Sequence, residues 1–353
     1  MRIAQVTPLY EAVPPRLYGG TERVVAHLTD ALVGLGHDVT LFASGDARTK
    51  ARLVPVRDQA IRLDPAPLKS DLAAHLNQIA EVRRRAGEFD VIHFHTDMVQ
   101  FPFFDGLAHK TLTTLHGRLD LKDLPAVYRR WPQFPLASIS DAQRRPLAFA
   151  NWAGTVHHGM PADLYSFSPR SQGYLAFLGR ISPEKGPERA IAIAKRLGQR
   201  LRIAAKVDAA DRAYFEAHIQ PLLDHPLIEF VGEIGDGEKS AFLGGADALL
   251  FPIEWPEPFG LVMIEAMACG TPVVAYNYGS VPEVVEPGLT GFIVEGEAQA
   301  AEAVAKARRL DRADVRLRFE RRFSANVMAK GYLELYQALV RPTRLPVALA
   351  ASA

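Results

Sequence analysis

Two glutamates in residues 251–276 have the type and spacing of ligand-binding groups. The stretch reads FPIEWPEPFGLVMIEAMACGTPVVAY, with Glu257 before a predicted helix start at Phe259-Gly260 and Glu265 within that helix. Apolar residues surround Glu265, where an unpaired charge is costly, so we expect it to face a polar cavity or a specific partner. Glu257 lies where the free N–H groups of a first helical turn favour an anionic or hydroxyl-rich ligand. Either residue alone could be structural, as a helix N-terminal acid or a paired core glutamate; with the residues below, they favour a ligand site.

A turn in the second half of the chain carries two cations. Residues 179–186 read GRISPEKG, and they place Arg180 and Lys185 between a predicted strand and a helix that begins at Pro187. Arginine and lysine beside a helix N-terminus are well suited to hold phosphate oxygens. The spacing departs from that of a Walker phosphate-binding loop. The alternative is a turn with two exposed cations.

Loops after predicted strands supply further candidates in the first half. Residues 8–20 form a Pro-rich loop that ends in Gly19-Gly20, and paired glycines let a ligand approach the backbone closely. The alternative is a turn that only starts the next helix. His116 also follows a predicted strand, where ligands of open α/β sheets bind. His93 and His95 share one strand face and could hold a metal, but no third ligand is evident nearby, so packed or cleft-lining histidines are favoured.

Short apolar runs alternate with amphipathic segments along the chain, which is typical of parallel sheets covered by helices. Helices are predicted at residues 21–35, 71–85 and 324–340, from apolar side chains that recur on one helical face. Strands are predicted at residues 3–6, 39–43, 91–94, 112–115, 136–139, 155–157, 174–178, 201–205, 228–231, 248–251, 273–275 and 292–294.

The strand–helix series is interrupted once, at residues 158–171. These residues contain glycine, two prolines and no helical periodicity, so we interpret them as an interdomain linker. The predicted division is a first domain at 1–165, a second at 166–323, a final helix at 324–341 that packs back across the first domain, and a frayed tail at 342–353.

The composition excludes several classes of protein. The 353 residues suffice for two domains with separate cores. With 41 lysines and arginines against 40 acids, the charge balance argues against nucleic-acid binding. A single cysteine, Cys269, excludes a disulfide framework and suits a reducing compartment. The chain starts in a strand without a signal peptide, and no apolar run reaches membrane-spanning length. We therefore expect a cytoplasmic protein with, at most, peripheral contact at the inner membrane face.

Taken in order, these motifs resemble those of glycosyltransferase family 4 enzymes. Each motif alone is weak, whereas the set in this order is highly specific for the family. The resemblance implies a GT-B architecture, in which two Rossmann-like α/β domains face each other across a cleft. It extends nearly end to end, and its carriers are Gly19-Gly20, His116-Gly117, Gly179-Arg180 with Lys185-Gly186, Glu257-Pro258-Phe259-Gly260-Leu261, Glu265-Ala266, VPEVV at 281–285 and GLTG at 288–291. One departure, HHGM at 157–160 where relatives often show Asn-Gly-Val, lies on the hinge side.

The resemblance implies a role for each carrier in binding a sugar-nucleotide donor. Arg180 and Lys185 would hold the diphosphate of the donor, and His116 would contact its sugar from the first domain. Glu257 would bind the same sugar with the backbone amides of Phe259, Gly260 and Leu261. The remaining donor-binding residues would be Glu265 at the ribose, Gly232 and Glu233 near the base, and Gly19 and Gly20 in the first loop.

The implied reaction is the retaining transfer of a hexose from a UDP- or GDP-sugar to an acceptor hydroxyl, with an α-linkage in the product. No D-x-D sequence occurs, so a metal on the diphosphate has no obvious ligands, and neither a metal nor another cofactor is expected. The acceptor would be a glycan, a lipid-linked sugar or a small molecule held by first-domain loops such as 8–20 and 131–140. The alternatives are a sugar-nucleotide epimerase of the same fold, an α-glucan phosphorylase, which would need a pyridoxal lysine and a longer chain, and a non-catalytic sugar-nucleotide binder.

Overall fold

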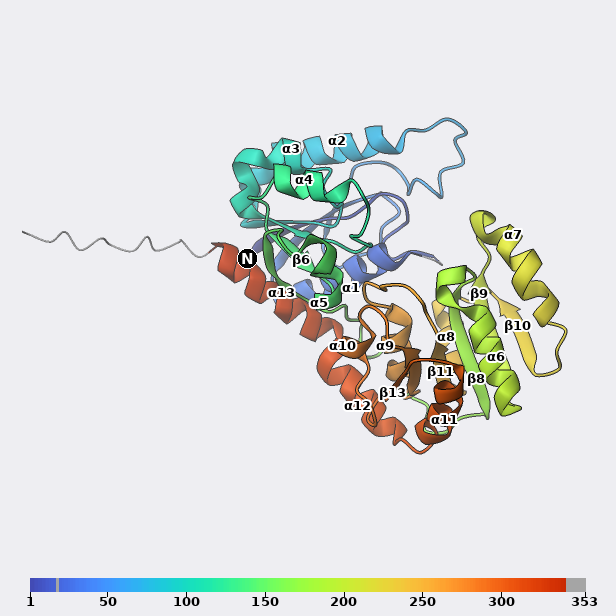
Figure 1. Ribbon diagram of the computed structural model, residues 1–353. Helices are drawn as coiled ribbons and strands as arrows, with labels where there is room; N and C mark the ends of the chain where they lie inside the picture. Colours follow the sequence, from blue (N-terminus) through green and yellow to red (C-terminus); the bar gives the residue numbers. More distant parts are fainter. Residues whose placement is uncertain (17–18, 341–353) are drawn as a thin grey trace, which may run out of the picture.

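The computed structural model describes residues 1–16 and 19–340, which form two lobes, each built on a parallel β-sheet (Figure 1). The first lobe has a seven-stranded sheet of order β3-β2-β1-β4-β5-β6-β7, and the second a six-stranded sheet of order β10-β9-β8-β11-β12-β13. All strand pairs within these sheets are parallel. The predicted α/β class with two Rossmann-like units is confirmed. The predicted frayed tail at 342–353 lies outside the described residues.

Helices connect the strands of the first sheet. The strands are β1 (Arg2–Val6), β2 (Asp38–Ala43), β3 (Arg52–Pro55), β4 (Val91–Phe94), β5 (Thr111–Thr114), β6 (Leu136–Ser138) and β7 (Trp152–Thr155). The helices are α1 (Gly20–Gly34), α2 (Asp71–Arg84), α3 (Phe101–Phe104), α4 (Leu124–Arg130) and α5 (Asp141–Arg144). Short 3-10 turns lie at Ala86–Glu88, Asp105–Lys110 and Arg145–Leu147.

The second lobe repeats this plan. Its strands are β8 (Tyr174–Arg180), β9 (Leu201–Lys206), β10 (Ile228–Gly232), β11 (Ala246–Phe251), β12 (Val273–Tyr276) and β13 (Gly291–Val294). Its helices are α6 (Pro187–Leu197), α7 (Arg212–Tyr214), α8 (Asp236–Gly244), α9 (Leu261–Ala268), α10 (Val281–Val284), α11 (Glu297–Ala307) and α12 (Arg312–Phe323). Further 3-10 turns lie at Pro183–Lys185, Ala209–Asp211 and Gln220–Leu222, and a π-helical turn lies at Phe215–Ile219.

The strand order of each sheet reverses once, between β1 and β4 in the first lobe and between β8 and β11 in the second. At such a reversal the connections leave the two neighbouring strands toward opposite faces of the sheet, which opens a crevice beyond their carboxyl ends. The loops that follow these four strands are therefore the expected positions for a ligand site in each lobe.

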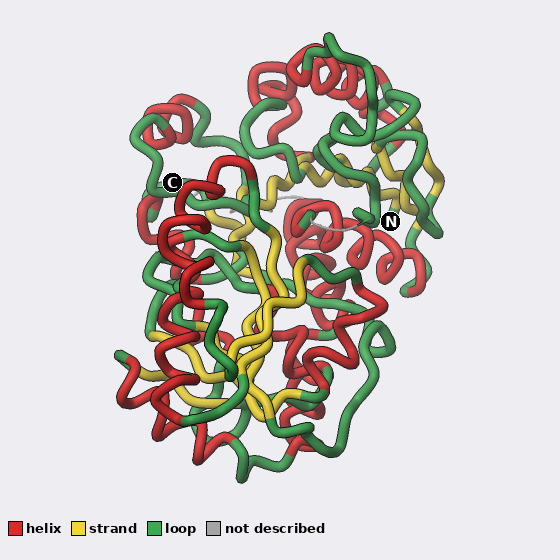
Figure 2. The backbone as a smooth tube through the Cα atoms, turned by 90° about the vertical axis from the view of Figure 1, so that its right-hand side faces the viewer, coloured by secondary structure: helices red, strands yellow, loops and turns green. Residues whose placement is uncertain are grey.

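Both faces of each sheet are covered, and this explains why the strands read as continuous apolar runs. Every residue of β11 and of β12 is buried. Parallel sheets of this kind need helices on both faces, and Figure 2 shows helices on either side of the strands. The strand prediction succeeds for most of the chain because this burial leaves a strong sequence signal.

The two edge strands of the first sheet depart from the prediction. The strand predicted at 155–157 lies earlier, as β7 (Trp152–Thr155), and β3 (Arg52–Pro55) was not predicted at all. The residues of both strands are only half-buried or exposed. Because an edge strand has one free side, it lacks the apolar run on which the prediction depends. The apolar residue Val156, within the predicted span, is buried just beyond the end of β7.

The last helix, α13 (Ala325–Val340), returns to the first lobe as predicted (Figure 1). Its residues Met328, Tyr332 and Tyr336 are buried in a core cluster with the apolar face of α1. Gln5 in β1 donates a hydrogen bond to the phenol oxygen of Tyr336 over 3.0 Å. The helix is thus part of the first lobe although it follows the second lobe in the chain.

The chain passes between the lobes twice, and the two passages are joined. Met160 on the first passage donates its N–H to Phe323 O over 3.0 Å, and its carbonyl accepts from Ala325 N over 2.8 Å. Met160 and Ser324 form a parallel β-bridge at this point. The two crossings therefore lie side by side.

Removing α13 is expected to destroy the fold of the first lobe. A chain that ends at residue 323 loses two fully buried tyrosines, each worth about 3–5 kcal/mol in a core, against a total stability of about 5–15 kcal/mol. We expect this chain to be insoluble or inactive, measured by soluble yield and turnover. A control ending at residue 341 keeps the whole helix and should remain active. Full activity of the shorter chain would show that α13 has no such role.

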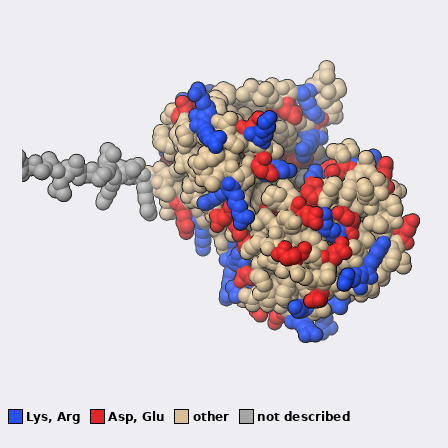
Figure 3. Space-filling view, in the orientation of Figure 1, with Lys and Arg blue, Asp and Glu red and all other residues tan. Residues whose placement is uncertain are grey.

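The face of the molecule drawn in Figure 3 carries charges of both signs. On the face in Figure 3, acidic and basic side chains are interspersed over both lobes, in keeping with the net charge of +1. Within residues 1–16 and 19–340, no helix combines the length and the apolar content needed to cross a bilayer.

Candidate active site

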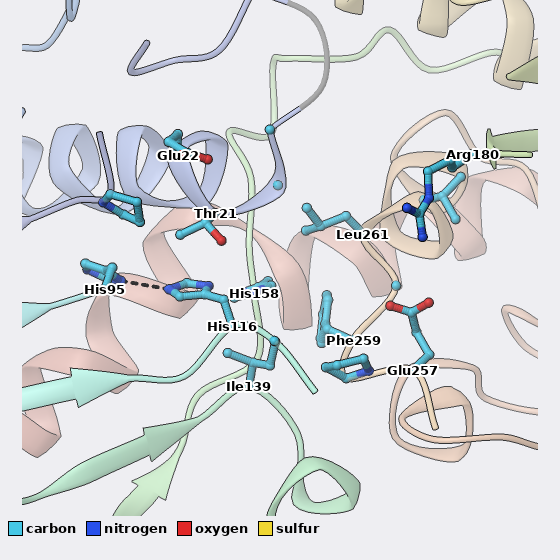
Figure 4. A pocket seen from close by; sticks show the side chains of 18 of the residues that line it. Thr21, Glu22, His95, His116, Ile139, His158, Arg180, Glu257, Phe259 and Leu261 are labelled. Atoms are coloured by element: carbon cyan, nitrogen blue, oxygen red, sulfur yellow. Dashed lines mark hydrogen bonds between the residues drawn. The ribbon is translucent and has the colours of Figure 1, made fainter. Parts of the chain in front are cut away.

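A cleft of about 540 Å³ opens between the lobes at the carboxyl ends of the strands that flank the two reversals. The first lobe lines it with the loop after β1, with His95 after β4 and with His116 after β5; the second lobe contributes Arg180 at the end of β8 and the loop after β11 (Figure 4). The volume is typical of small-molecule sites, which span roughly 300–1,000 Å³. The lobes come close at Gly20, where an added Cβ would lie 3.8 Å from Leu261 Cδ1.

The two predicted cations lie at the wall of this cleft. The guanidinium of Arg180 is held by Glu184 at 2.8 Å and by Asp208 and Asp211, each at 3.8 Å. Its Nε is buried and has no hydrogen-bond partner among the described residues. The ammonium of Lys185 pairs with Glu257 and lies 4.8 Å from the centroid of the Trp255 ring. These contacts fix the direction of both cationic groups.

Glu257 is fixed by its side chain and by its backbone. The carboxylate pairs with Lys185 and accepts a hydrogen bond from Trp255 Nε1 over 3.0 Å. Its backbone carbonyl accepts from Ser280 N over 3.0 Å, and the Ser280 hydroxyl donates to Phe259 O over 2.8 Å. The loop before α9 is thereby locked, with Glu257 facing the cleft from the second lobe in Figure 4.

Gly260 allows α9 to begin at the cleft. It is the N-cap residue of α9 and has φ +75°, a conformation that favours glycine. An added Cβ would lie only 2.9 Å from Met263 Cε and 3.0 Å from Phe251 Cζ. No side chain caps this helix, so the N–H groups of Leu261 and Val262 stay available at the cleft wall, whereas Met263 N donates to Gly260 O over 3.0 Å.

A second cavity of about 170 Å³ continues from the first, and six residues line both. These six are Gly19, Gly20, Leu178, Gly179, Leu261 and Val262. The predicted ribose and base residues Glu265 and Glu233 line the second cavity. Gly232 lines neither cavity; it ends β10 with φ +79° and immediately precedes Glu233. An elongated ligand can thus extend from one cavity into the other.

Glu265 is buried, as its apolar surroundings predicted. It lines the second cavity and also contacts polar side chains. Its carboxylate lies 2.8 Å from Lys239 Nζ and 3.3 Å from the Tyr165 hydroxyl. Both partners also contact Asp236, which in turn pairs with Arg23 of the first lobe. These four residues were not predicted from the sequence. A charge-balanced network therefore surrounds the predicted ribose site and reaches across the lobes.

Three histidines meet on the first-lobe side of the cleft. His95 Nδ1 lies 2.8 Å from His116 Nε2, and the rings of His116 and His158 stack with centroids 5.2 Å apart (Figure 4). Burial lowers the pKa of His116 to about 3.

His93 lies behind these three histidines and is hydrogen-bonded to Tyr336 and Thr114. Among the described residues, no group of three or more His, Cys, Asp or Glu side chains could hold a metal ion. The packed or cleft-lining interpretation of His93 and His95 agrees with these contacts.

Two acids of the first lobe that were not singled out also line the cleft. Glu22 lies in the first turn of α1 and is only 5% exposed, and burial raises its pKa to about 7. Asp97 follows β4 and has φ +53°, which is uncommon for a residue other than glycine. An acid two residues after the paired glycines was the one sequence signal for Glu22. A carboxyl group with a pKa near neutrality inside a cleft is typical of functional sites.

Glu22 is expected to make the stability of the protein pH-dependent. Between pH 4.5 and about 7 the folded protein keeps a proton on Glu22 that the unfolded chain has released, so the free energy of unfolding falls as the pH rises. The contribution of Glu22 to stability is therefore complete below pH 4.5 and is lost as the pH rises through 7. Glu22→Gln cannot titrate, so its stability relative to the wild type should increase over this range by up to about 1.4 kcal/mol per pH unit. Urea unfolding of both proteins at pH 5, 6, 7 and 8 measures the difference. Parallel pH profiles would contradict the assignment.

The structure brings the predicted site residues together. Apart from Gly232, all of them line one of the two joined cavities: His116, Arg180, Lys185, Glu257, Gly19, Gly20, Glu233, Phe259, Gly260, Leu261 and Glu265. They come from both lobes and from loops that are far apart in the chain. Their individual roles toward a ligand stay predictions.

Comparisons with known proteins agree with this architecture. The sequence model described as "Glycosyltransferase Family 4" matches residues 18–153, and the one described as "Glycosyl transferases group 1" matches residues 166–324. The chain is 29% identical to a glycogen synthase of Mycobacterium tuberculosis (strain CDC 1551 / Oshkosh) over 409 residues, covering 98% of this chain and 97% of the relative. It is 26% identical to a phosphatidyl-myo-inositol mannosyltransferase of Mycobacterium leprae (strain TN), covering 96% and 97%.

Solved structures show the same fold. The protein Alr3699/HepE of Anabaena, crystallised with UDP and glucose, superposes with a TM-score of 0.73 at 19% identity, over 96% of this chain and 100% of that one. Two adjacent family matches span both lobes, and two open parallel sheets face each other over a cleft lined by the predicted residues. The chain therefore belongs to glycosyltransferase family 4 and has the GT-B fold.

Proposed function

We propose that this glycosyltransferase moves a hexose from a UDP- or GDP-sugar to an acceptor hydroxyl with retention, to give an α-linked product. The observation that carries the proposal is the pair of joined cavities with Arg180 and Lys185 on the wall of one and Glu265 in the other. A nucleoside diphosphate sugar is an elongated ligand with a ribose at one end, two phosphates in the middle and a sugar at the other. Glu265 would bind the ribose, Arg180 and Lys185 would bind the phosphates, and the part of the cleft near Glu257 would receive the sugar.

Breaking the glycosidic bond of the donor places negative charge on the leaving phosphate. Two fixed cations and the free N–H groups at the start of α9 would stabilise that charge where it develops. Glu257, held by Lys185 and Trp255, would accept hydrogen bonds from hydroxyls of the transferred sugar. The acceptor would approach from the first lobe, where Glu22, Asp97 and His116 line the cleft. Closure of the lobes would exclude water, which competes with the acceptor.

A panel of sugar nucleotides tests the donor class. A ligand that binds only the folded state raises the melting temperature, so the cognate donor and its nucleoside diphosphate should stand out among UDP, GDP and ADP sugars. The Anabaena protein has also been crystallised with UDP-glucose, which makes UDP-glucose the first donor to test. Turnover is then measured with glycan, lipid-linked and small-molecule acceptors, and anomeric proton couplings of the product report retention. A panel without any shift or turnover would contradict the proposal.

The same measurements separate the alternatives. A sugar-nucleotide epimerase would convert the donor when no acceptor is present, and a non-catalytic binder would show a thermal shift without turnover. The convergence of Arg180, Lys185, Glu257 and Glu265 on one site argues against the non-catalytic binder. Product analysis with donor alone and with donor plus acceptor decides between them.

Activity is expected to survive removal of divalent metals. The chain has no D-x-D sequence, and we propose that Arg180 and Lys185 replace a metal in holding the diphosphate. Rates in excess EDTA should therefore stay within about twofold of those in Mg²⁺. EDTA removes Mg²⁺ from the free nucleotide, but Arg180 and Lys185 remain in the protein. Activity that vanishes in EDTA and returns with Mn²⁺ would overturn this prediction.

A further inference from the structure

A line of buried hydrogen bonds joins the last helix to the cleft. Gln5 Nε2 lies 3.0 Å from the Tyr336 hydroxyl, Gln5 Oε1 lies 2.8 Å from His95 Nε2, and His95 Nδ1 lies 2.8 Å from His116 Nε2. Gln5 and Tyr336 are fully buried, and His95 is 2% exposed. The last link of the line, between the two histidines, is drawn in Figure 4.

The side-chain amide of Gln5 gives this line a direction. Its NH₂ group donates to Tyr336, so the oxygen that faces His95 can only accept. His95 must then carry its proton on Nε2. In a neutral imidazole the other nitrogen has no proton, so His95 Nδ1 accepts, and His116 has to donate to it from Nε2.

His116 is consequently left with a bare Nδ1. This atom is buried and has no hydrogen-bond partner among the described residues, although the side chain lines the cleft. A buried acceptor without a donor is costly. Because solvent does not reach the atom in this conformation, a ligand hydroxyl can supply that donor only if the ring or its neighbours shift as the ligand enters the cleft.

Burial keeps the histidines of the line neutral. Burial lowers the pKa of His116 to about 3, and burial with the neighbouring histidines lowers the pKa of His95 and of His158 well below the usual range. A protonated His116 would donate from both nitrogens and could not offer an acceptor. At neutral pH the ring thus keeps one nitrogen bare.

We propose that Gln5, His95 and Tyr336 are positioning residues that hold His116 in its Nε2–H form, so that Nδ1 accepts a hydrogen bond from a hydroxyl of the sugar being transferred. The identity of the donor hydroxyl rests on the proposed function. The tautomer of His116 does not, because it depends only on the orientation of the Gln5 amide among protein groups.

The far end of the line supports the same direction. Tyr336 also contacts His93 Nδ1 at 2.7 Å, His93 Nε2 lies 2.7 Å from Thr114 Oγ1, and Thr114 donates to Tyr332 over 3.0 Å. If the Gln5 amide were turned over, every link would reverse and His116 would present an N–H to the cleft. The two arrangements differ in whether His116 Nδ1 carries a proton, so an experiment can choose between them.

Nitrogen NMR of the protein labelled with ¹⁵N-histidine provides the direct test. The His116 signals are assigned by their loss in His116→Gln. In the wild type at pH 7 we expect a protonated Nε2 and an unprotonated Nδ1 for both His95 and His116. A protonated Nδ1 on His116 would overturn the proposal, whether or not the protein transfers sugars.

Tyr336→Phe and Tyr332→Phe form a matched pair for the positioning role. Both tyrosines are fully buried on α13, and each variant loses one hydroxyl, but only Tyr336 contacts Gln5. Tyr336→Phe should mix the two tautomers of His116 and lower kcat by about five- to tenfold, with the Kd of nucleoside diphosphate within about twofold. Tyr332→Phe removes only the last link of the line, beyond Thr114 and His93, and should change the tautomer and the rate much less. Equal effects of the two variants would show a structural role only.

Deoxy analogues of the donor identify the partner of Nδ1. One monodeoxy sugar should lower the rate of the wild-type enzyme by about five- to tenfold and that of Tyr336→Phe much less, because the hydrogen bond is already impaired in the variant. If no deoxy donor distinguished the two enzymes while the NMR tautomer was as expected, Nδ1 would not contact the sugar and this part of the proposal would be wrong. Absence of turnover with every donor would instead contradict the proposed function.

Discussion

Arg180→Ala and Lys185→Ala are each expected to lower kcat/KM by roughly 30- to 1,000-fold, which corresponds to about 2–4 kcal/mol of transition-state stabilisation. Both side chains lie on the cleft wall at the proposed position of the diphosphate. Their positive charge matters most when the glycosidic bond breaks and the leaving phosphate gains charge. The folded structure should persist, since both residues lie at the end of a strand or in a turn.

A third cation nearby provides the control. Arg189 lies in α6, pairs with Glu188 and Glu254, and lines neither cavity. Arg189→Ala should therefore keep nearly normal kcat/KM, measured by steady-state rates with the cognate donor. Normal turnover of either Arg180→Ala or Lys185→Ala would mean that the diphosphate does not bind there.

Part of the loss in Lys185→Ala would come through Glu257, because the variant removes the partner of a nearly buried carboxylate. A double-mutant cycle with Glu257→Gln separates the two contributions. If Lys185 acts on the phosphate directly, it should still lower the rate when Glu257 is already replaced. If it acts only by holding Glu257, the double variant should be no worse than Glu257→Gln.

Substituting the two glutamates should have different consequences. Glu257 faces the cleft, so Glu257→Gln is expected to lower kcat strongly for the cognate donor and to leave the Kd of the nucleoside diphosphate nearly unchanged. Glu265 lines the second cavity, so Glu265→Gln should weaken nucleotide and sugar nucleotide alike, because the ribose is common to both. An equal loss of affinity for both ligands shows that the residue contributes to uniform binding. A loss confined to kcat shows that it acts in the transition state.

Calorimetric titration with nucleoside diphosphate, paired with steady-state rates, measures this difference. Lys239→Met is the informative companion, because it removes the ammonium that lies 2.8 Å from Glu265 and leaves the carboxylate itself in place. It should weaken nucleotide binding as Glu265→Gln does if the pair acts as a unit. The assignment of the two roles would be reversed if Glu257→Gln abolished nucleotide binding while Glu265→Gln preserved it.

The features that could be predicted from the sequence are those that leave a local signal. Central strands such as β11 are buried on both faces and read as apolar runs, and the loops after them are ligand positions by the geometry of parallel sheets. Arg180, Lys185 and Glu257 could be found in this way. Glu265 could be found because a charge among apolar residues requires a reason.

What could not be predicted depends on contacts between distant residues. Lys239 and Tyr165 reach Glu265 from positions 26 and 100 residues away. Glu22 has its raised pKa because the folded protein buries it, which composition does not reveal. The tautomer of His116 depends on Gln5 and Tyr336, which are 331 residues apart. Pairings of this kind are settled only when the lobes and the last helix are assembled.

The return of α13 to the first lobe has a consequence for how the protein is made. The ribosome releases residues of the first lobe long before the helix that completes its core with Met328, Tyr332 and Tyr336. During synthesis this lobe exposes an apolar surface on α1 while the second lobe is being made, although domains generally fold in the order in which they emerge. The second lobe, whose own strands are contiguous from Tyr174 to Val294, can fold first. The lobe that begins the chain is therefore the last to be finished.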